Sequence, residues 1–210
     1  DMYGALPYSQ ISSDKLSAPY DTMEEAYHAM FTDLTDAINV MTVYVTENPN
    51  NRTMAKYDKV YDGDFEKWVK FANSLKLRMA IRIRFADREY ARQMAEEAIN
   101  HSIGVITSNE DNATSLGTKN QLYTVLVQWP DQCVSADITS YMKGYNDPRM
   151  SKYFKKKTSD KGDDDYVGMR AGLSYGNDIT GPTFSRINVG EMDRTLWMSA
   201  AETAFNKAEA

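Results

Sequence analysis

Few side chains in this sequence could do covalent chemistry. The chain has one cysteine, Cys133, and two histidines, His28 and His101. A cysteine nucleophile needs a histidine base beside it, and one histidine falls in a predicted helix while the other directly follows one. A lone cysteine also excludes an intrachain disulfide and a multi-cysteine zinc site. We therefore predict no catalytic residues and a buried or neutral thiol at Cys133.

Carboxylates are numerous, but no pair or cluster stands out. Folding could bring any two of the thirty Asp and Glu residues to the separation that glycoside hydrolysis uses, and the sequence singles out none. Asp163, Asp164 and Asp165 follow Gly162, yet they lack the alternating spacing of a calcium-binding loop. A solvated acidic turn is the expectation there. We predict no metal site, no cofactor and no enzymatic activity.

Aromatic side chains on loops suggest a different chemistry, since the chain has 14 Tyr, 3 Trp and 7 Phe residues. A flat ring can stack on the apolar face of a pyranose while nearby polar groups hydrogen-bond its hydroxyls. Tyr27, Trp68 and Trp197 fall on apolar stripes of predicted helices and are assigned to the core. The aromatic residues on predicted loops, and hence the predicted ligand contacts, are Tyr3, Tyr8, Tyr123, Trp129, Tyr166 and Tyr175.

Composition and charge narrow the function classes further. With 24 basic against 30 acidic residues, the net charge is −6, which argues against a nucleic-acid partner. Hydrophobic residues at 42% and charged residues at 26% are ordinary for a globular chain, and 210 residues can bury a substantial core. No apolar run approaches the roughly 18 to 20 residues of a membrane-spanning helix.

Four periodic segments predict the helices that must position these loops. Asp21, with Glu24 three residues later, predicts a helix start, and Pro49 ends that helix after about residue 45. Asp64 and Asp87 are the predicted N-caps of two further helices, which form an antiparallel hairpin because almost nothing joins them. The fourth helix is predicted from about residue 195 to 210. The helical scaffold is thus expected at about 21–104 and 195–210.

The intervening region, about 105–194, is rich in Gly, Asp, Asn and Ser, as loops are. Within it, Tyr123–Trp129 is short, apolar and β-branched, which predicts a strand or extended segment. Asp137–Tyr145 predicts a short helix. The sequence Asn146-Asp147-Pro148-Arg149 then predicts a corner that defines the fold, because Pro148 forbids helix continuation and the two preceding side chains can bond their own backbone.

The helices carry a degraded internal repeat. Trp68, Phe71, Ala72 and Leu75 have the spacing of the first half of a tetratricopeptide repeat, and small residues with the spacing of the second half follow about seven residues late. Seven residues are close to two helical turns, so a longer first helix would present the same face. Any helical hairpin with small residues at its crossing would look similar. The predicted class is all-α, with tetratricopeptide-like hairpins and long irregular loops.

Several ordered motifs resemble those of the SusD/RagB family of outer-membrane lipoproteins. They are Tyr3-Gly4-Ala5-Leu6-Pro7-Tyr8, Tyr61-Asp62-Gly63-Asp64, the run from Trp68 to Arg78, Asn146-Asp147-Pro148-Arg149 and the terminal segment from Ala201 to Ala210. The resemblance spans nearly the whole chain, so residues 1–210 are expected to form a portion of a single SusD-like domain. In the family, the segment that matches residues 3–8 lies near the ligand site.

The resemblance implies a non-catalytic protein on the outer face of the outer membrane. It would bind a nutrient, most often a glycan, and deliver it to a TonB-dependent transporter barrel of the SusC-like kind. Family members begin with an acylated cysteine and continue past the matching terminal helix, so we expect this sequence to be an internal piece. Membrane contact would be made only through a lipid anchor absent from this sequence. The alternatives are a peptide-binding member of the family and a tetratricopeptide-like scaffold for a protein partner.

Overall fold

The computed structural model describes residues 5–10, 17–115, 117–129, 132–157, 165–172 and 183–210. Within these ranges it has seven α-helices and four strands of two or three residues, so the predicted all-α class is confirmed. The chain divides into two compact units, residues 1–116 with 196–210 and residues 117–195. None of the helices in the described ranges combines the length and the apolar character needed to cross a membrane.

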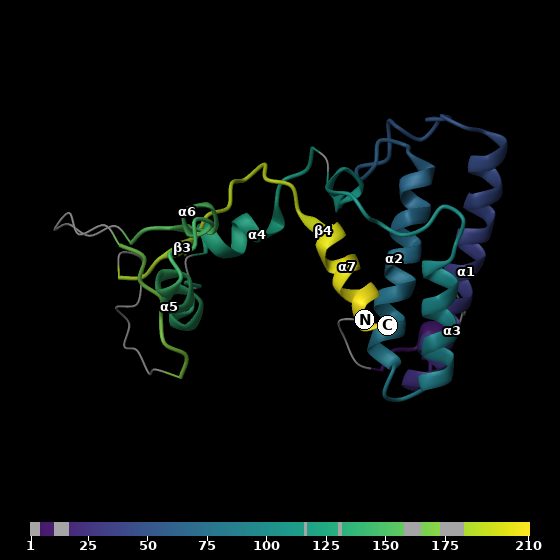
Figure 1. The fold of residues 1–210 in the computed structure, drawn as a ribbon, viewed down its shortest axis with the longest axis horizontal. Helices are drawn as coiled ribbons and strands as arrows, with labels where there is room; N and C mark the ends of the chain where they lie inside the picture. Colours follow the sequence, from purple (N-terminus) through teal and green to yellow (C-terminus); the bar gives the residue numbers. More distant parts are fainter. Residues whose placement is uncertain (1–4, 11–16, 116, 130–131, 158–164, 173–182) are drawn as a thin grey trace. The chain divides into compact units, whose positions relative to one another are not determined.

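The first unit is built around α2 (Phe65–Ile83). The helices α1 (Met23–Glu47), α3 (Arg88–Ile99) and α7 (Ala200–Glu209) all pack against it (Figure 1). Only residues 84–87 join α2 to α3, and the two helices form the predicted antiparallel hairpin. The unit also contains two 3₁₀ turns, η1 (Tyr8–Gln10) before α1 and η2 (Asn109–Asp111) after α3.

The start of α1 is one residue later than predicted. Thr22 is the N-cap: its hydroxyl accepts from the amide of Glu25 at 3.2 Å, and the Glu25 carboxylate accepts from the Thr22 amide at 2.9 Å. This reciprocal pair is a capping box, which satisfies two amides at once. Asp21 instead accepts from the amide and hydroxyl of Ser9, both at 2.7 Å. The predicted caps of α2 and α3, Asp64 and Asp87, are confirmed.

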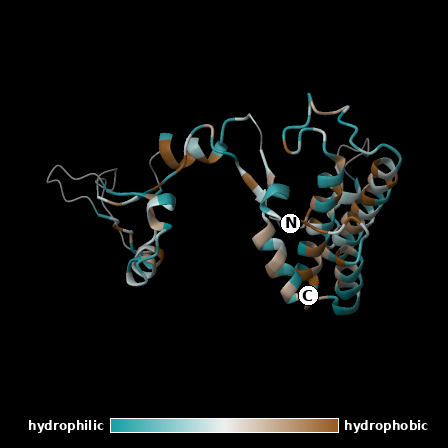
Figure 2. Ribbon diagram, turned by 45° about the horizontal axis from the view of Figure 1, so that its top comes forward, coloured by the Kyte–Doolittle hydropathy of each residue, from teal (hydrophilic) through white to brown (hydrophobic). Residues whose placement is uncertain are grey.

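The apolar stripes of the three long helices meet in one core cluster. Phe31 on α1 and Leu77 on α2 are fully buried there, together with Met94 and Ala98 on α3. Along the helices of this unit apolar and polar residues alternate (Figure 2). Tyr27 is buried in this cluster, and Trp68 packs against a second one, so two of the three predicted core aromatics are confirmed.

The turn before α2 is organised by one carboxylate. Asp58 accepts hydrogen bonds from the amides of Val60 at 2.9 Å, Tyr61 at 3.2 Å and Gly63 at 2.8 Å, and from Nε1 of Trp68 at 2.8 Å. The Trp68 ring in turn meets the Tyr61 ring edge to face, with centroids 5.4 Å apart. This carboxylate therefore ties the turn to α2 and to the second core cluster.

The last helix starts at Ala200, later than the predicted start at about residue 195. Residues Leu196–Met198 form the strand β4, which pairs antiparallel with β1 (Ala113–Thr114), and α7 starts only after Ser199. The hydroxyl of Ser199 accepts from the amide of Glu202 at 3.1 Å and so fixes the helix start. Trp197 lies on β4 and is 48% exposed, so its assignment to a helical core stripe was wrong.

The second unit contains short elements. They are α4 (Gln121–Tyr123), a π-helical turn at Thr124–Gln128, α5 (Ala136–Gly144), α6 (Met150–Tyr153), and the strands β2 (Phe154–Lys155) and β3 (Arg186–Ile187), which pair antiparallel. The segment Tyr123–Trp129 is thus helical up to Gln128, not extended as predicted. Asn120 starts this helix, because its side chain accepts from the amide of Leu122 at 2.9 Å.

Gly168 lets a neighbouring segment approach the start of α5. Met169 donates to the Val134 carbonyl at 2.7 Å, and Ala136 donates to the Met169 carbonyl at 2.8 Å. A Cβ atom on Gly168 would overlap the carbonyl oxygen of Ser135 and approach Cα of Ala136 to 2.5 Å. The backbone contact that anchors α5 therefore depends on the absence of a side chain at position 168.

Replacing Gly168 with alanine is expected to destabilise the second unit by about 3 kcal/mol, because the obstructing atoms are two backbone atoms, of Ser135 and Ala136, and the hydroxyl of the buried Thr139 side chain. Urea unfolding monitored by circular dichroism measures this change. Gly144→Ala is the matched control: no atom lies within 4 Å of its added Cβ, and alanine favours the helix. Equal unfolding midpoints for the two variants would contradict the prediction.

Candidate functional site

The second unit exposes three tyrosines around an open hollow. Tyr141 on α5 is 68% exposed, Tyr145 at the C-cap of α5 is 72% exposed, and Tyr153 on α6 is also exposed. The hollow has a volume of about 860 Å³. We call it the tyrosine groove, and its lining residues are Asp137, Ile138, Tyr141, Met142, Tyr145, Asp147, Arg149 and Tyr153.

Helical spacing brings the first two rings together. Tyr141 and Tyr145 are four residues apart at the end of α5, and so lie on the same face. Their ring centroids are 4.8 Å apart with the planes inclined by 44°. On the same helix Thr139 is buried, and so is Met142 at the inner edge of the groove. Burial of these two side chains holds the two tyrosine rings outward.

The predicted corner after α5 brings the third ring to the groove. Asn146 has a positive φ of 49°, and its amide donates to the Lys143 carbonyl at 3.1 Å. The Asp147 amide donates to the Met142 carbonyl at 2.9 Å, and Pro148 then prevents the helix from continuing. The chain turns and starts α6, which carries Tyr153. The predicted corner is confirmed.

A fixed ion pair supplies polar groups beside the rings. Nε of Arg149 lies 2.9 Å from Oδ1 of Asp147, and Nη2 lies 2.6 Å from Oδ2, so the pair is bidentate. Hydrogen bonds from the Arg149 side chain and amide lower the pKa of Asp147 to about 2, which keeps the pair ionised at neutral pH. The guanidinium also lies 5.9 Å from the centroid of the Tyr153 ring. Its orientation is therefore set before any ligand arrives.

A second hollow of about 720 Å³ adjoins the same helix. Asp137, Tyr141 and Tyr145 line both hollows, while Ser140 and Arg170 belong to the second. The tyrosine pair thus borders two open spaces. Flat rings beside oriented hydrogen-bonding groups are what the face and the hydroxyls of a sugar require.

Three of the six predicted ligand contacts lie in the second unit but outside the tyrosine groove. Trp129 follows the π-helical turn and is 60% exposed. Tyr123 and Tyr166 are partly buried, and Nζ of Lys156 lies 5.8 Å from the Tyr166 ring centroid. Among the described residues, the structure records no contact between any two of these three rings. Their role in ligand binding stays a prediction.

The other three predicted contacts lie near the N-terminus or in undescribed segments. Tyr8, in the first unit, is partly buried, and its hydroxyl donates to Oδ2 of Asp33 on α1 at 2.8 Å. That hydrogen bond raises the pKa of the Tyr8 hydroxyl. Tyr3 and Tyr175 lie outside the described residues. The contact role of all three stays a prediction as well.

Sequence reasoning missed Tyr141, Tyr145 and Tyr153 because it discounted aromatic residues on helices. The signal was present: two tyrosines four residues apart, next to a corner with Asp147 and Arg149. An aromatic side chain on a helix remains exposed to solvent when no other segment packs against that face of the helix. Among the described residues, no group of His, Cys, Asp or Glu is placed to hold a metal ion.

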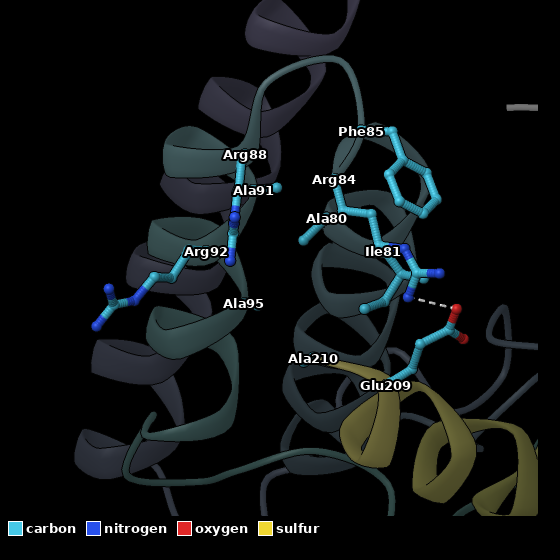
Figure 3. A pocket seen from close by; sticks show the side chains of 10 residues that line it. All are labelled: Ala80, Ile81, Arg84, Phe85, Arg88, Ala91, Arg92, Ala95, Glu209 and Ala210. Carbon is cyan, nitrogen blue, oxygen red and sulfur yellow. Dashed lines mark ion pairs between the residues drawn. The ribbon is translucent and has the colours of Figure 1, made fainter.

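The first unit has a different hollow, between the ends of α2, α3 and α7 (Figure 3). Its volume is about 360 Å³, and we call it the arginine groove. Figure 3 shows Arg88 and Arg92 on one side, and Arg84 and Phe85 on the other. Nη1 of Arg84 pairs with Oε1 of Glu209 at 2.5 Å. Its other lining residues are Ala80, Ile81, Ala91, Ala95 and Ala210.

Comparisons with known proteins identify the family. The model of the SusD-like family, described as SusD and RagB outer membrane lipoproteins, matches residues 1–210. A SusD homologue from Bacteroides uniformis is 43% identical, with a TM-score of 0.83, over 99% of this chain and 43% of its own. No functionally curated protein matches the chain.

A chitin-binding SusD homologue from Flavobacterium johnsoniae is 34% identical, with a TM-score of 0.85, over 98% of this chain and 43% of its own. A SusD-like protein from Bacteroides thetaiotaomicron is 36% identical, with a TM-score of 0.83. The chain therefore spans less than half the length of these solved structures. With the family model matched over all 210 residues, the chain belongs to the SusD/RagB family.

Proposed function

We propose that this chain binds an oligosaccharide through the tyrosine groove without chemically changing it. The observation that carries the proposal is the exposed Tyr141–Tyr145 pair beside the ion pair of Asp147 and Arg149. The rings supply apolar stacking surface, and the guanidinium and carboxylate supply hydrogen bonds to hydroxyls. No step of this function requires a nucleophile or a metal.

The geometry favours weak but specific capture. An open groove covers only one side of a sugar, so affinity should fall in the micromolar to millimolar range. Because the Arg149 side chain is held by Asp147 before binding, little conformational entropy is lost when a ligand meets it. Tyr3, Tyr8, Tyr123, Trp129, Tyr166 and Tyr175 are proposed as further contacts with longer ligands.

The family assignment supports the biological setting of this proposal. The chain belongs to a family of outer membrane lipoproteins, and one similar solved structure is a chitin-binding homologue. We propose that the whole protein is anchored by lipid at the cell surface and passes its glycan to a SusC-like, TonB-dependent transporter. Co-purification with such a barrel would support the transporter step independently of ligand binding.

Isothermal titration calorimetry with hexasaccharides of chitin, starch, cellulose and xylan tests the binding proposal. We expect at least one hexasaccharide to bind, and Tyr141→Ala to weaken that binding. Tyr57→Ala is the matched control, because Tyr57 is an equally exposed tyrosine of the first unit. Binding that survives Tyr141→Ala unchanged would contradict the tyrosine groove as the site. Product analysis of the same mixtures would detect turnover, which we expect to be absent.

The arginine groove favours a second function, the binding of a protein or peptide segment. Its alanines allow a helix to approach closely, and Arg88 would attract acidic side chains of that helix, whereas Arg92 already pairs with Glu96 at 2.8 Å. An acidic amphipathic peptide that binds the chain, and loses affinity on Arg88→Glu, would support this function. A glycan that binds through Tyr141 would support the first function instead.

A further inference from the structure

We infer that the tyrosine groove selects uncharged glycans over anionic ones, and that Asp137 sets this selection. The inference rests on the proposed function, since it names the ligand class of the same site. It follows from how the three charged side chains of the groove are paired.

Two of these charges cancel. Arg149 and Asp147 face one another in the bidentate geometry described above, with the shorter N–O distance at 2.6 Å. A guanidinium that already engages a carboxylate in this way offers a ligand hydrogen-bond donors but almost no net positive charge. An anionic sugar would therefore gain little from Arg149, although arginine is the usual residue for binding carboxylates and phosphates.

The third charge is not balanced by a cation. Oδ2 of Asp137 accepts from the hydroxyl of Ser135 at 3.0 Å, which is a neutral donor. Among the described residues, the structure records no ion pair to Asp137. The lining of the tyrosine groove thus carries one net negative charge, from Asp137.

Charged residues near the tyrosine groove do not reverse its net negative charge. Lys143, also on α5, is outside the groove lining, and its ammonium pairs with Oδ2 of Asp165 at 2.5 Å. Arg170 shares the second hollow with Asp137, but it is not in the lining of the tyrosine groove, and the structure records no ion pair between these two described residues. The start of α5 contributes a partial positive charge near Asp137, but it is smaller than a full carboxylate charge and is screened by solvent.

A ligand in the groove would therefore meet a carboxylate that it can only satisfy by donating hydrogen bonds. Sugar hydroxyls donate, whereas a uronate or sulfate group accepts and adds repulsion. A second negative charge about 5 to 8 Å from an exposed carboxylate should weaken binding about three- to tenfold at low salt. The same carboxylate thus favours neutral sugars and disfavours acidic ones.

The test compares chitohexaose, maltohexaose and cellohexaose with the same sugars carrying one uronate in place of a CH₂OH group. We expect the wild-type chain to bind a neutral form three- to tenfold more tightly than its acidic form, with a smaller ratio at 0.5 M salt. Asp137→Asn should abolish the difference, and Asp137→Glu should retain it. Asp36→Asn, which removes an exposed charge from α1, should leave the ratio unchanged.

The outcomes separate the inference from the function it rests on. If a hexasaccharide binds through Tyr141 but its acidic form binds as tightly, or Asp137→Asn keeps the preference, the inference is wrong and the proposed function stands. If no hexasaccharide binds, or binding ignores Tyr141→Ala, the proposed function fails and the inference falls with it. Thermal unfolding of each variant confirms that the protein remains folded.

Discussion

Replacing Tyr141 and Tyr145 together by alanine should weaken glycan binding about 100-fold. Each ring can cover on the order of 60 Å² of a sugar face, which corresponds to about 1.5 kcal/mol, or roughly tenfold in affinity. Both side chains are exposed in the free protein, so their removal should leave the folded structure intact. Titration calorimetry of the two single variants and the double variant measures the effect.

The 100-fold loss is what two independent rings would give, and because these rings lie 4.8 Å apart the measured loss should depart from it by their coupling energy. A double-mutant cycle should reveal a coupling energy, since either ring supports the other in its stacking position. Tyr141→Phe keeps the ring and loses only the hydroxyl, so it should retain most of the affinity. A double variant that binds as well as the wild type would remove the tyrosine groove as the site.

Replacing Asp58 by alanine is expected to lower the free energy of unfolding of the first unit by about 3 kcal/mol. Three backbone amides and the Trp68 indole lose their common charged acceptor, and each such bond is worth more than a neutral one. Partial solvent access to the turn moderates the cost. Urea unfolding followed by tryptophan fluorescence measures the change.

The pH dependence provides an independent check on Asp58. Burial would raise its pKa, but the hydrogen bonds from Trp68 and the backbone amides outweigh burial, and the pKa is lowered. A carboxylate with a lowered folded pKa contributes its full stability above its unfolded pKa of about 3.9 and loses it as the pH falls through the folded value. Asp58→Asn should remove this acid-dependent part of the unfolding free energy.

The control for both measurements is Asp62→Asn in the same turn. Asp62 has a φ of 54°, a conformation that asparagine adopts readily, and its side chain is exposed. Its unfolding free energy should stay within about 0.5 kcal/mol of the wild type. If Asp58→Ala were equally neutral, the turn would not depend on that carboxylate.

The helical frame could be predicted from the sequence because local signals agree with long-range packing. Asp64 and Asp87 are caps in both the prediction and the structure, and the apolar stripes of α2 and α3 face the same core. The N-cap of α1 was misplaced because Asp21 and Thr22 both begin a capping pattern. Only the bonds of Asp21 to Ser9, twelve residues away, decide between them.

The remaining errors share a physical cause, which is tertiary context. Trp197 continues the helical spacing of α7, yet pairing of Met198 with Ala113 holds it in a strand. The apolar segment after Asn120 has strand propensity, yet the Asn120 cap and its amide bond to the Glu191 carbonyl start a helix. The tyrosine groove was missed for the same reason, since no local pattern reveals whether a helix face will be covered.

The entire lining of the tyrosine groove falls between positions 137 and 153, a contiguous stretch of the chain. Its decisive contacts are short in sequence: rings four residues apart and an ion pair two residues apart. None of these residues belongs to the core clusters of the helical frame. Substitutions in this stretch should therefore change the ligand preference proposed for the groove while leaving the helical frame unchanged.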